Sequence, residues 1–413
     1  MTVRLPVQLR LDATFTALKY PNYRLWFTGQ IVSLFGTWMQ STAQGFLVYE
    51  LTQSPAFLGY VGFAAGLPSW LFMLYGGVVA DRISRRNLLV ITQSSMMILA
   101  FILSALTFTG AVRPWHIILL AFLLGVANAF DAPARLALAP ELVAKEDLTN
   151  AIALNGTMFN TATIVGPTVG SLIYALFGAG WCFFLNGASF LAVIFALLRM
   201  KLPDLVNEAR RSSSAISDIM EGFQYVLAQP VILALISLIS AVSLFGSSFI
   251  TLLPAWAVQV LSGDVKTNGL LNSARGVGAL IGALSIASLG RFRYRGKLLT
   301  IGLFVFPVML LIFSMISWLP LSLLVLTIVG ASLVFVMNLA NAMIQTNVSD
   351  NVRGRVTSIY SLTFFGFMPI GSLLIGQIAE QAGERPALQF GAVMLLLVAA
   401  ATQMIYPKLR AVE

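Results

Sequence analysis

The run Ser33-Leu34-Phe35-Gly36 occurs a second time as Ser243-Leu244-Phe245-Gly246, at an offset of 210 residues from position 33 to position 243. The same offset relates Asn128 to Asn338, which lie in a different segment of each half. One short match can arise by chance, whereas a constant register in separate segments indicates an internal repeat. The sequence therefore predicts two copies of one structural unit.

Each copy consists of long apolar segments. Hydrophobic residues make up 58% of the 413-residue chain, charged residues 10%, and the mean hydropathy is +0.88. These values are typical of a chain whose solvent is lipid, since a helix that crosses the bilayer core needs about 20 apolar residues. We identify twelve such segments, at residues 22–48, 56–80, 88–109, 114–138, 148–177, 181–200, 230–256, 266–290, 297–317, 319–347, 354–379 and 386–406.

The predicted fold is an all-α integral membrane protein with twelve transmembrane helices in two pseudo-symmetric six-helix bundles. The bundles comprise residues 1–200 and 230–413, and residues 201–229 form a linker between them. The second part of the linker has apolar residues at helical spacing with acidic residues opposite, which is typical of an amphipathic helix on a membrane surface. A tether between the bundles and a docking segment are both compatible with this pattern.

The distribution of positive charge predicts the topology. The net charge is +9, and the 25 Lys and Arg residues lie almost entirely in segments that share a side with the N-terminus. Only Arg113, Lys266 and Arg385 fall on the other side, and Arg275 falls within a span. The positive-inside rule therefore places both termini in the cytoplasm. No basic stripe is left over for nucleic acid, so we expect no nucleic-acid partner.

The loop after the second span carries a recognisable motif. It reads Gly77-Val78-Val79-Ala80-Asp81-Arg82-Ile83-Ser84-Arg85-Arg86 and resembles the signature of the major facilitator superfamily, with Ser84 in place of a glycine. The small Gly77 would let helices approach. Asp81, Arg82 and Arg85 are predicted to form a charge cluster that holds one conformation closed and releases in the other. Simple topological anchoring by the arginines is the alternative.

Further stretches resemble one branch of that superfamily, the enterobactin-exporter-like and macrolide-efflux-like bacterial exporters. These stretches are Tyr23-Arg24-Leu25-Trp26, Asp131-Ala132-Pro133-Ala134-Arg135 and Glu221-Gly222-Phe223-Gln224-Tyr225-Val226. The fifth span also contains Gly166, Pro167 and Gly170, which resemble the core of a motif associated with export, although Ser171 replaces its last glycine. These residues predict a helix bend with close packing; a kink alone is the alternative. The resemblance implies an exporter in the cytoplasmic (inner) membrane of a bacterium.

Polar residues inside spans are candidates for a substrate cavity, because they are costly in lipid. The first span carries them on one face, and the fourth span carries Asn128, Asp131 and Arg135, whose counterparts in the second half include Asn338 and Asn341. The resemblance implies a cavity lined by the first, fourth, seventh and tenth spans. The predicted cavity residues are Thr37, Trp38, Gln40, Gln44, Asn128, Phe245, Phe249, Arg275, Asn338 and Asn341. Interhelical hydrogen bonding is the structural alternative.

Two charged residues within spans allow more than one interpretation. Asp131 is either a proton-coupling group or part of a gating latch with Arg135 or Arg82. Arg275 is either an anchor for an anionic or carbonyl-rich substrate or a partner in a structural salt bridge to Asp131, to Glu50 or to backbone carbonyls.

The predicted function is secondary active export of small amphipathic, drug-like molecules by alternating access, coupled to proton antiport. A dedicated exporter of a siderophore or another anionic metabolite and a lipid flippase are alternatives within transport. A membrane enzyme or sensor is the alternative outside it, but one cysteine, Cys182, and one histidine, His116, supply no catalytic set. We expect no cofactor or metal, and as partners a small-molecule substrate, protons and the lipid bilayer, with the protein acting as a monomer.

Overall fold

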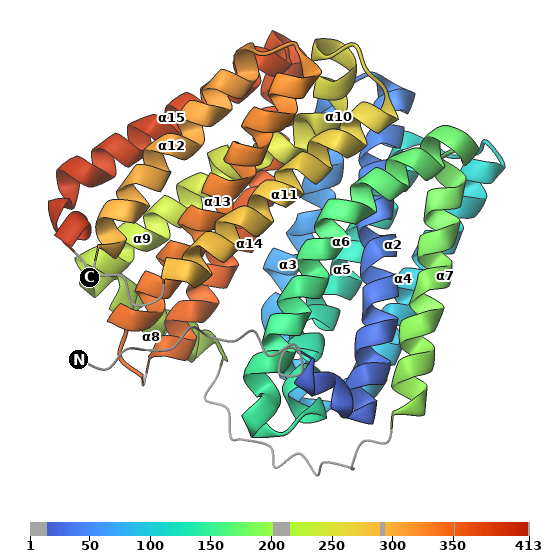
Figure 1. The fold of residues 1–413 in the computed structure, drawn as a ribbon, viewed down its shortest axis with the longest axis horizontal. Helices are drawn as coiled ribbons and strands as arrows, with labels where there is room; N and C mark the ends of the chain where they lie inside the picture. Colours follow the sequence, from blue (N-terminus) through green and yellow to red (C-terminus); the bar gives the residue numbers. More distant parts are fainter. Residues whose placement is uncertain (1–14, 201–214, 290–293, 351, 412–413) are drawn as a thin grey trace, which may run out of the picture.

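The computed structural model describes residues 15–200, 215–289, 294–350 and 352–411, and within these ranges no strand occurs. Six long helices form a first group, which lies to the right in Figure 1. They are α2 (Pro21–Thr52), α3 (Pro55–Arg82), α4 (Arg85–Phe108), α5 (Pro114–Leu138), α6 (Leu148–Phe177) and α7 (Ala179–Arg199). Several of these helices begin with proline, whose fixed φ suits the first helical turn and whose missing N–H leaves no unsatisfied donor there.

The second group has a matching set of helices, with α8 (Ala215–Ala228) preceding it. Its regular helices are α9 (Pro230–Ala241), α11 (Val265–Leu289), α12 (Arg295–Met315), α13 (Leu319–Asn347), α14 (Arg353–Ala382) and α15 (Glu384–Ile405). The span that α9 begins is irregular beyond Ala241. It continues through wide π turns in η4 (Val242–Gly246), tight 3₁₀ turns in η5 (Ser247–Leu252), the short α10 (Leu253–Ala255) and further π turns in η6 (Trp256–Val260).

The described part of the chain thus contains twelve long helical segments at the predicted positions, as the sequence pattern required. Ten of them are long and apolar enough to cross a membrane by composition alone. The two that do not qualify are α2 and α6. In α2 the reason is its polar content, since Gln30, Gln40 and Gln44 lie in its middle and are all buried in the protein. Such side chains are tolerated in a span when they face the interior.

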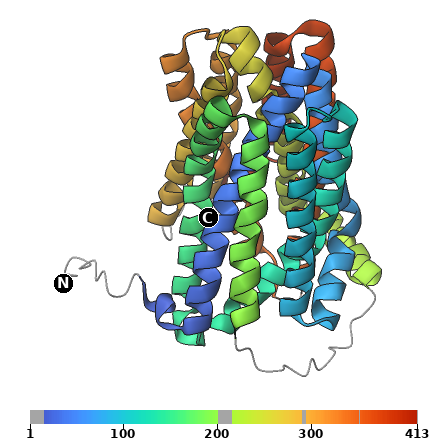
Figure 2. The same cartoon turned by 90° about the vertical axis from the view of Figure 1, so that its right-hand side faces the viewer.

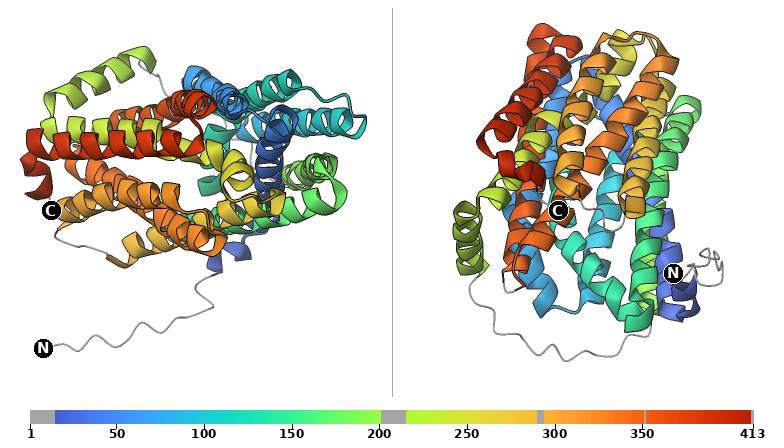
Figure 3. Two further views of the ribbon diagram at one scale, coloured as in Figure 1. Left: turned by 90° about the horizontal axis from the view of Figure 1, so that it is seen from above. Right: turned by 60° about the vertical axis from the view of Figure 1, so that its left-hand side comes forward.

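The two groups pack against each other through two helix pairs, α3 with α14 and α6 with α11. Figure 2 shows the first group from its own side, and the view from above in Figure 3 shows the groups side by side. In Figure 1 their ribbons diverge toward the end where η1 (Thr16–Lys19) and α8 lie. Helix α8 lies alongside α14, where Glu221 forms an ion pair with Arg355.

Several hydrogen bonds between the groups lie at the other end, which we call the sealed end. There the Ser54 hydroxyl donates to Glu380 Oε2 at 2.6 Å, and Gln377 Nε2 donates to the Tyr60 hydroxyl at 2.9 Å. Gln259 Nε2 also donates to the hydroxyl of Tyr49, at 2.9 Å. These side chains come from both groups, so together they close this end of the molecule.

Candidate functional site

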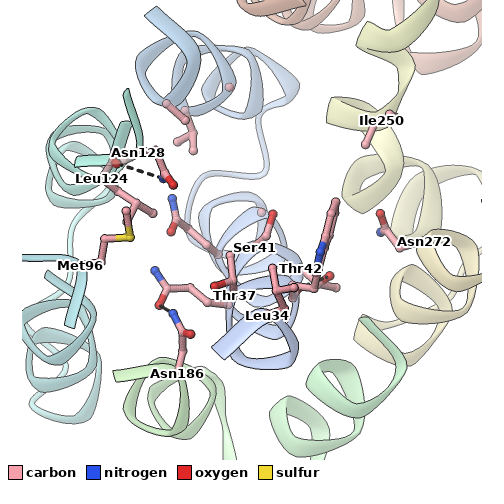
Figure 4. Close-up of a pocket in the computed structure, with 18 of the residues that line it drawn as sticks. Leu34, Thr37, Ser41, Thr42, Met96, Leu124, Asn128, Asn186, Ile250 and Asn272 are labelled. Atoms are coloured by element: carbon pink, nitrogen blue, oxygen red, sulfur yellow. Dashed lines mark hydrogen bonds between the residues drawn. The ribbon is translucent and has the colours of Figure 1, made fainter. Parts of the chain in front are cut away.

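A cavity of about 440 Å³ lies between the two groups and extends into the first. Figure 4 shows α2 crossing it, with Leu124 and Asn128 of α5 on one side and Ile250 of η5 and Asn272 of α11 on the other. The lining therefore comes from α2, α3, α4, α5, α6 and α7 of the first group and from η5, α10 and α11 of the second.

Helix α2 supplies a polar stripe along one face. Gln30, Ser33, Gln40 and Gln44 are buried and line the cavity at the spacing of one helix face. The Asn186 amide of α7 donates to Gln40 Oε1 at 2.7 Å, which fixes the orientation of that glutamine. The exposed Thr37 and the half-buried Trp38, also predicted for the cavity, both line it.

The close approach of α7 to α2 depends on Gly36. A Cβ atom at this position would lie 2.5 Å from Asn186 Oδ1 and 2.5 Å from Ser189 Oγ, which is shorter than any normal contact. The glycine therefore lets a polar face of α7 pack directly on the polar face of α2. Gly36, the last residue of the repeated run Ser33-Leu34-Phe35-Gly36, thus has a packing role in the first group.

Asp131 is the sole carboxylate among the described residues that line the cavity, and it is 1% exposed. Its Oδ1 accepts hydrogen bonds from Thr92 Oγ1 at 2.9 Å and from Gln93 Nε2 at 2.8 Å. Its Oδ2 lies 3.5 Å from Arg135 Nε, one turn further along α5. Of the two partners considered for Asp131, Arg135 is therefore the adjacent one, whereas Arg82 is exposed at the end of α3.

Arg275 enters the cavity from α11 and stands without a partner. It has no hydrogen bond or ion pair with any residue in the described ranges, and its Nε is buried. Within the described residues it forms no ion pair with Asp131 or Glu50 and no hydrogen bond with a backbone carbonyl, the three structural partners considered for it. Asp131 pairs with Arg135, and Glu50 accepts a hydrogen bond from Tyr174.

Four predicted cavity residues lie elsewhere in this conformation. Phe249 is 1% exposed within the core of the second group, and Phe245 packs on Phe390 with ring centroids 6.2 Å apart. On α13, Asn338 is exposed, and Asn341 accepts a hydrogen bond from Gln345 Nε2 at 3.2 Å. None of these four lines the cavity.

The lining also includes polar residues that sequence reasoning missed. Among them are Gln93 on α4, Asn186 on α7, and, as the last two, Asn268 and Asn272 on α11. A signal existed for the last two, because Asn268, Asn272 and Arg275 follow one another at i, i+4 and i+7. The positions of Gln93 and Asn186 carried no comparable pattern.

The predicted charge cluster after α3 is partly described. Arg85 forms an ion pair with Glu141, and its Nη1 donates to the carbonyl of Ala137 at 3.3 Å. The side chain of Asp81 lies outside the described residues. The expectation that Gly77 permits a close helix contact is wrong in this conformation, since a Cβ there would meet nothing within 4 Å. The neighbouring Gly76 makes that contact instead, against the backbone of Ala129 on α5.

The glycines predicted on α6 do lie at a close contact. A Cβ at Gly166 would be 2.6 Å from Trp38 Cβ, and one at Gly170 would be 2.9 Å from Met39 Cα, so both glycines let α6 pack on α2. Pro167 lies inside the same helix, and its carbonyl faces Gly269 of α11. This segment of α6 therefore contacts a helix of each group.

Two bundles of membrane-spanning helices around a polar cavity define a secondary transporter with the major facilitator fold. A solved structure of a bacterial homologue of the human lysosomal transporter Spinster has this fold, with a TM-score of 0.75, 13% identity, and coverage of 94% of this chain and 98% of that one. The profile of the family described as transmembrane secretion effector matches residues 12–413, so the chain belongs to that family.

Two relatives of known function agree with this assignment. The staphyloferrin A transporter of Staphylococcus aureus is 26% identical over 87% of this chain and 90% of its own length. The macrolide efflux protein A of Streptococcus pyogenes is 24% identical over 94% of this chain and 97% of its own length. The resemblance to bacterial exporters is thereby confirmed, and the chain is a multi-pass membrane protein that exports small molecules.

Proposed function

We propose that the protein exports amphipathic compounds from the cytoplasm of a bacterium by proton antiport, with Asp131 carrying the proton. The observation that carries this proposal is the environment of Asp131, a buried carboxylate on the wall of the cavity. A proton acceptor that is coupled to transport must reach the substrate cavity and must be stable in both of its protonation states. The contacts of Asp131 meet both conditions.

The charged form of Asp131 is stabilised by donors on each oxygen: Thr92 and Gln93 donate to Oδ1, and Arg135 lies beside Oδ2. The neutral form also has a partner. The Thr92 hydroxyl lies 3.1 Å from the carbonyl of Leu89 and can donate there, which frees its oxygen to accept from a protonated Asp131. Protonation then removes the charge that holds Arg135, so that proton binding can be transmitted along α5.

The arrangement of the bundles supports alternating access. The positive-inside rule puts the sealed end outside, so the cavity would open toward the cytoplasm, as substrate loading requires. The solved Spinster homologue is described as inward-facing, which agrees with this orientation. We further propose that residues 1–200 and 230–413 move as two bodies, with α8 in the tether between them. We also propose that one chain is the transport unit.

Purified protein in liposomes tests the antiport. An imposed pH gradient, more acidic on the side of the sealed end, should drive ethidium across the membrane in the wild type. Asp131→Asn should abolish the response to the gradient while retaining exchange of labelled for unlabelled ethidium, because exchange needs no net proton movement. Asp350→Asn is the control, since Asp350 pairs with Arg353 away from the cavity. A wild type that ignores the gradient, or an Asp131→Asn variant that still responds, would refute proton coupling through Asp131.

A further inference from the structure

We propose that Asn268, Asn272 and Arg275 of α11 form a subsite for a carboxylate, or a similar oxyanion, of the transported molecule. This inference rests on the proposed function, because it assigns a substrate class to the same cavity. The three residues lie at i, i+4 and i+7, so they share one face of α11, and all three line the cavity. They form part of its wall in the second group, and Figure 4 shows Asn272 across the cavity from Leu124 and Asn128 of α5, the helix that also carries Asp131.

This wall carries hydrogen-bond donors without acceptors. Asn268 is fully buried, and within the described ranges its Nδ2 has no acceptor, as is the case for Arg275 Nε. Asn272 Nδ2 donates to the Asn268 carbonyl at 3.0 Å and to Asn268 Oδ1 at 3.2 Å, so the acceptor of the Asn268 side chain is already engaged. Buried donors left unpaired destabilise a structure, and a bound acceptor would remove that penalty.

The net charge of the cavity lining also favours an anionic ligand. Its ionisable groups are Asp131, Arg135 and Arg275. Asp131 and Arg135 form an ion pair, which leaves one uncompensated positive charge, at Arg275. A guanidinium presents a planar fork of donors that matches a carboxylate, and an unpaired charge inside a membrane protein is rare unless it has a function.

The internal repeat shows that the helix crossing does not need this arginine. Gly330 of α13 packs against the carbonyl of Arg275, and Gly125 of α5 packs in the same way against the carbonyl of Ala65. Ala65 and Arg275 occupy corresponding positions of the repeat, at the offset of 210. The first group makes this contact with an alanine, so the arginine side chain adds something other than packing.

Equilibrium binding of two matched dyes tests the subsite. Rhodamine B and its ethyl ester share a chromophore and differ in one free carboxylate. Their affinities are measured by fluorescence anisotropy with protein in lipid nanodiscs, where no proton gradient exists. The wild type should prefer rhodamine B. Arg275→Gln should weaken rhodamine B binding by about tenfold or more, the scale of a charge-assisted hydrogen bond, and should change ester binding by less than about twofold.

Three further variants complete the design. Asn268→Leu keeps the size of the side chain and should weaken rhodamine B binding by about threefold to tenfold. Arg275→Lys keeps the charge without the planar fork of donors, so its affinity for rhodamine B should fall between those of the wild type and Arg275→Gln. Because it is the conservative change, an intermediate affinity also shows that the loss in Arg275→Gln is not a folding defect. Lys266→Gln removes a positive charge from the exposed start of the same helix and should leave both affinities unchanged.

A wild type without preference for rhodamine B would overturn the proposal. So would an equal loss of both dyes in Arg275→Gln, which would assign the arginine to structure, or an equal effect of Lys266→Gln, which would indicate general electrostatic attraction. The result is independent of proton coupling. Retained dye preference with no gradient-driven transport would refute the antiport alone, and the reverse combination would refute the subsite alone.

Discussion

Glu380→Ala should open the sealed end. Glu380 lies on α14 of the second group, yet its Oε2 accepts from the Ser54 hydroxyl at 2.6 Å and from the backbone N–H of Ala56 at 3.2 Å, both at the start of α3 in the first group. Ser54 occupies the position before the first helical turn, but its side chain makes no capping hydrogen bond to its own helix. Glu380 therefore caps α3 from the other bundle, and this contact exists only while the sealed end is closed.

The size of the effect follows from this geometry. Loss of a side-chain cap destabilises a helix start by about 1 kcal/mol, and a carboxylate also interacts favourably with the positive end of the helix dipole. Because Glu380 is exposed, solvent screening keeps the free energy that it contributes to the sealed state near the low end of the range for charged hydrogen bonds. A change of about 1 kcal/mol shifts the ratio of sealed to unsealed molecules by about fivefold.

Electron spin resonance distances between labels at the opposite end measure that ratio. Ser84→Cys in the α3–α4 turn and Ser349→Cys after α13 place one exposed label on each bundle. The single native cysteine, Cys182, is buried, and Cys182→Ala removes it from the labelling chemistry. Glu380→Ala should increase the population with a short label distance by about fivefold, because closure at this end accompanies opening of the sealed end.

Glu384→Ala is the matched control. Glu384 begins α15 four residues after Glu380, with the same charge, and no hydrogen bond to the first group involves it within the described part of the chain. Glu380→Gln retains an acceptor and should give a smaller shift. An unchanged distance distribution in Glu380→Ala, or an equal shift in Glu384→Ala, would show that the cap does not hold the sealed end.

Three other outcomes are expected. Gly36→Val should lower the stability of the protein by about 1–3 kcal/mol, because the new Cβ would overlap Asn186 and Ser189. Gly77→Ala, with open space around it, should have no such effect. Scanning fluorimetry in detergent distinguishes the two variants, and equal effects would contradict the packing argument. The hydrogen bond from Lys19 lowers the pKa of Asp147, and the hydrogen bond from Tyr20 contributes further. Attachment of η1 should therefore persist above pH 3.8 and weaken as the pH falls below it. Amide exchange at residues 16–20 should show this acid-dependent step in the wild type and not in Asp147→Asn. Phe223→Trp on α8 should be quenched by brominated lipid, since Met220, Phe223 and Leu227 are exposed on one face; absence of quenching would mean that α8 does not touch the bilayer.

The fold could be predicted from the sequence because the bilayer imposes a length on each span. Apolar runs of about 20 residues leave little freedom, and every predicted segment corresponds to a long helix of the structure. The irregular turns between Val242 and Val260 could not be predicted, because this stretch is as apolar as a regular helix. What distinguishes it is a change in backbone hydrogen bonding, which hydropathy does not record.

The cavity was only half predictable, for a related reason. Extending the repeat from Asn128 to Asn338 assumed that both groups present the same helices to the cavity. Helix α13 begins at Leu319, so Asn338 lies 19 residues, or roughly 28 Å of helix, from that start, whereas Asn128 lies 14 residues from Pro114. In the described conformation the second group instead presents α11 to the cavity. The polar residues of α11 have no polar counterparts in α3, so the internal repeat could not predict them.

The two junctions between the groups are alike in packing and differ in polar contacts, and this difference suggests where opening begins. Gly59 of α3 lies against Ser372 of α14, and Gly269 of α11 lies against Ser171 of α6, so the serine that departs from the export motif has a counterpart in the other repeat. At the α6–α11 junction the hydroxyl of the exposed Thr168 lies 2.7 Å from that of the buried Ser273, an uncharged contact. Within the described residues, only the α3–α14 junction has a carboxylate that accepts hydrogen bonds across it, that of the exposed Glu380. Ser273 is buried, and its hydroxyl also lies 2.5 Å from the carbonyl of Ile164 on α6. Because water can replace the partners of the exposed Glu380 more readily than those of Ser273, the α3–α14 junction should separate first, with α6 and α11 acting as the pivot.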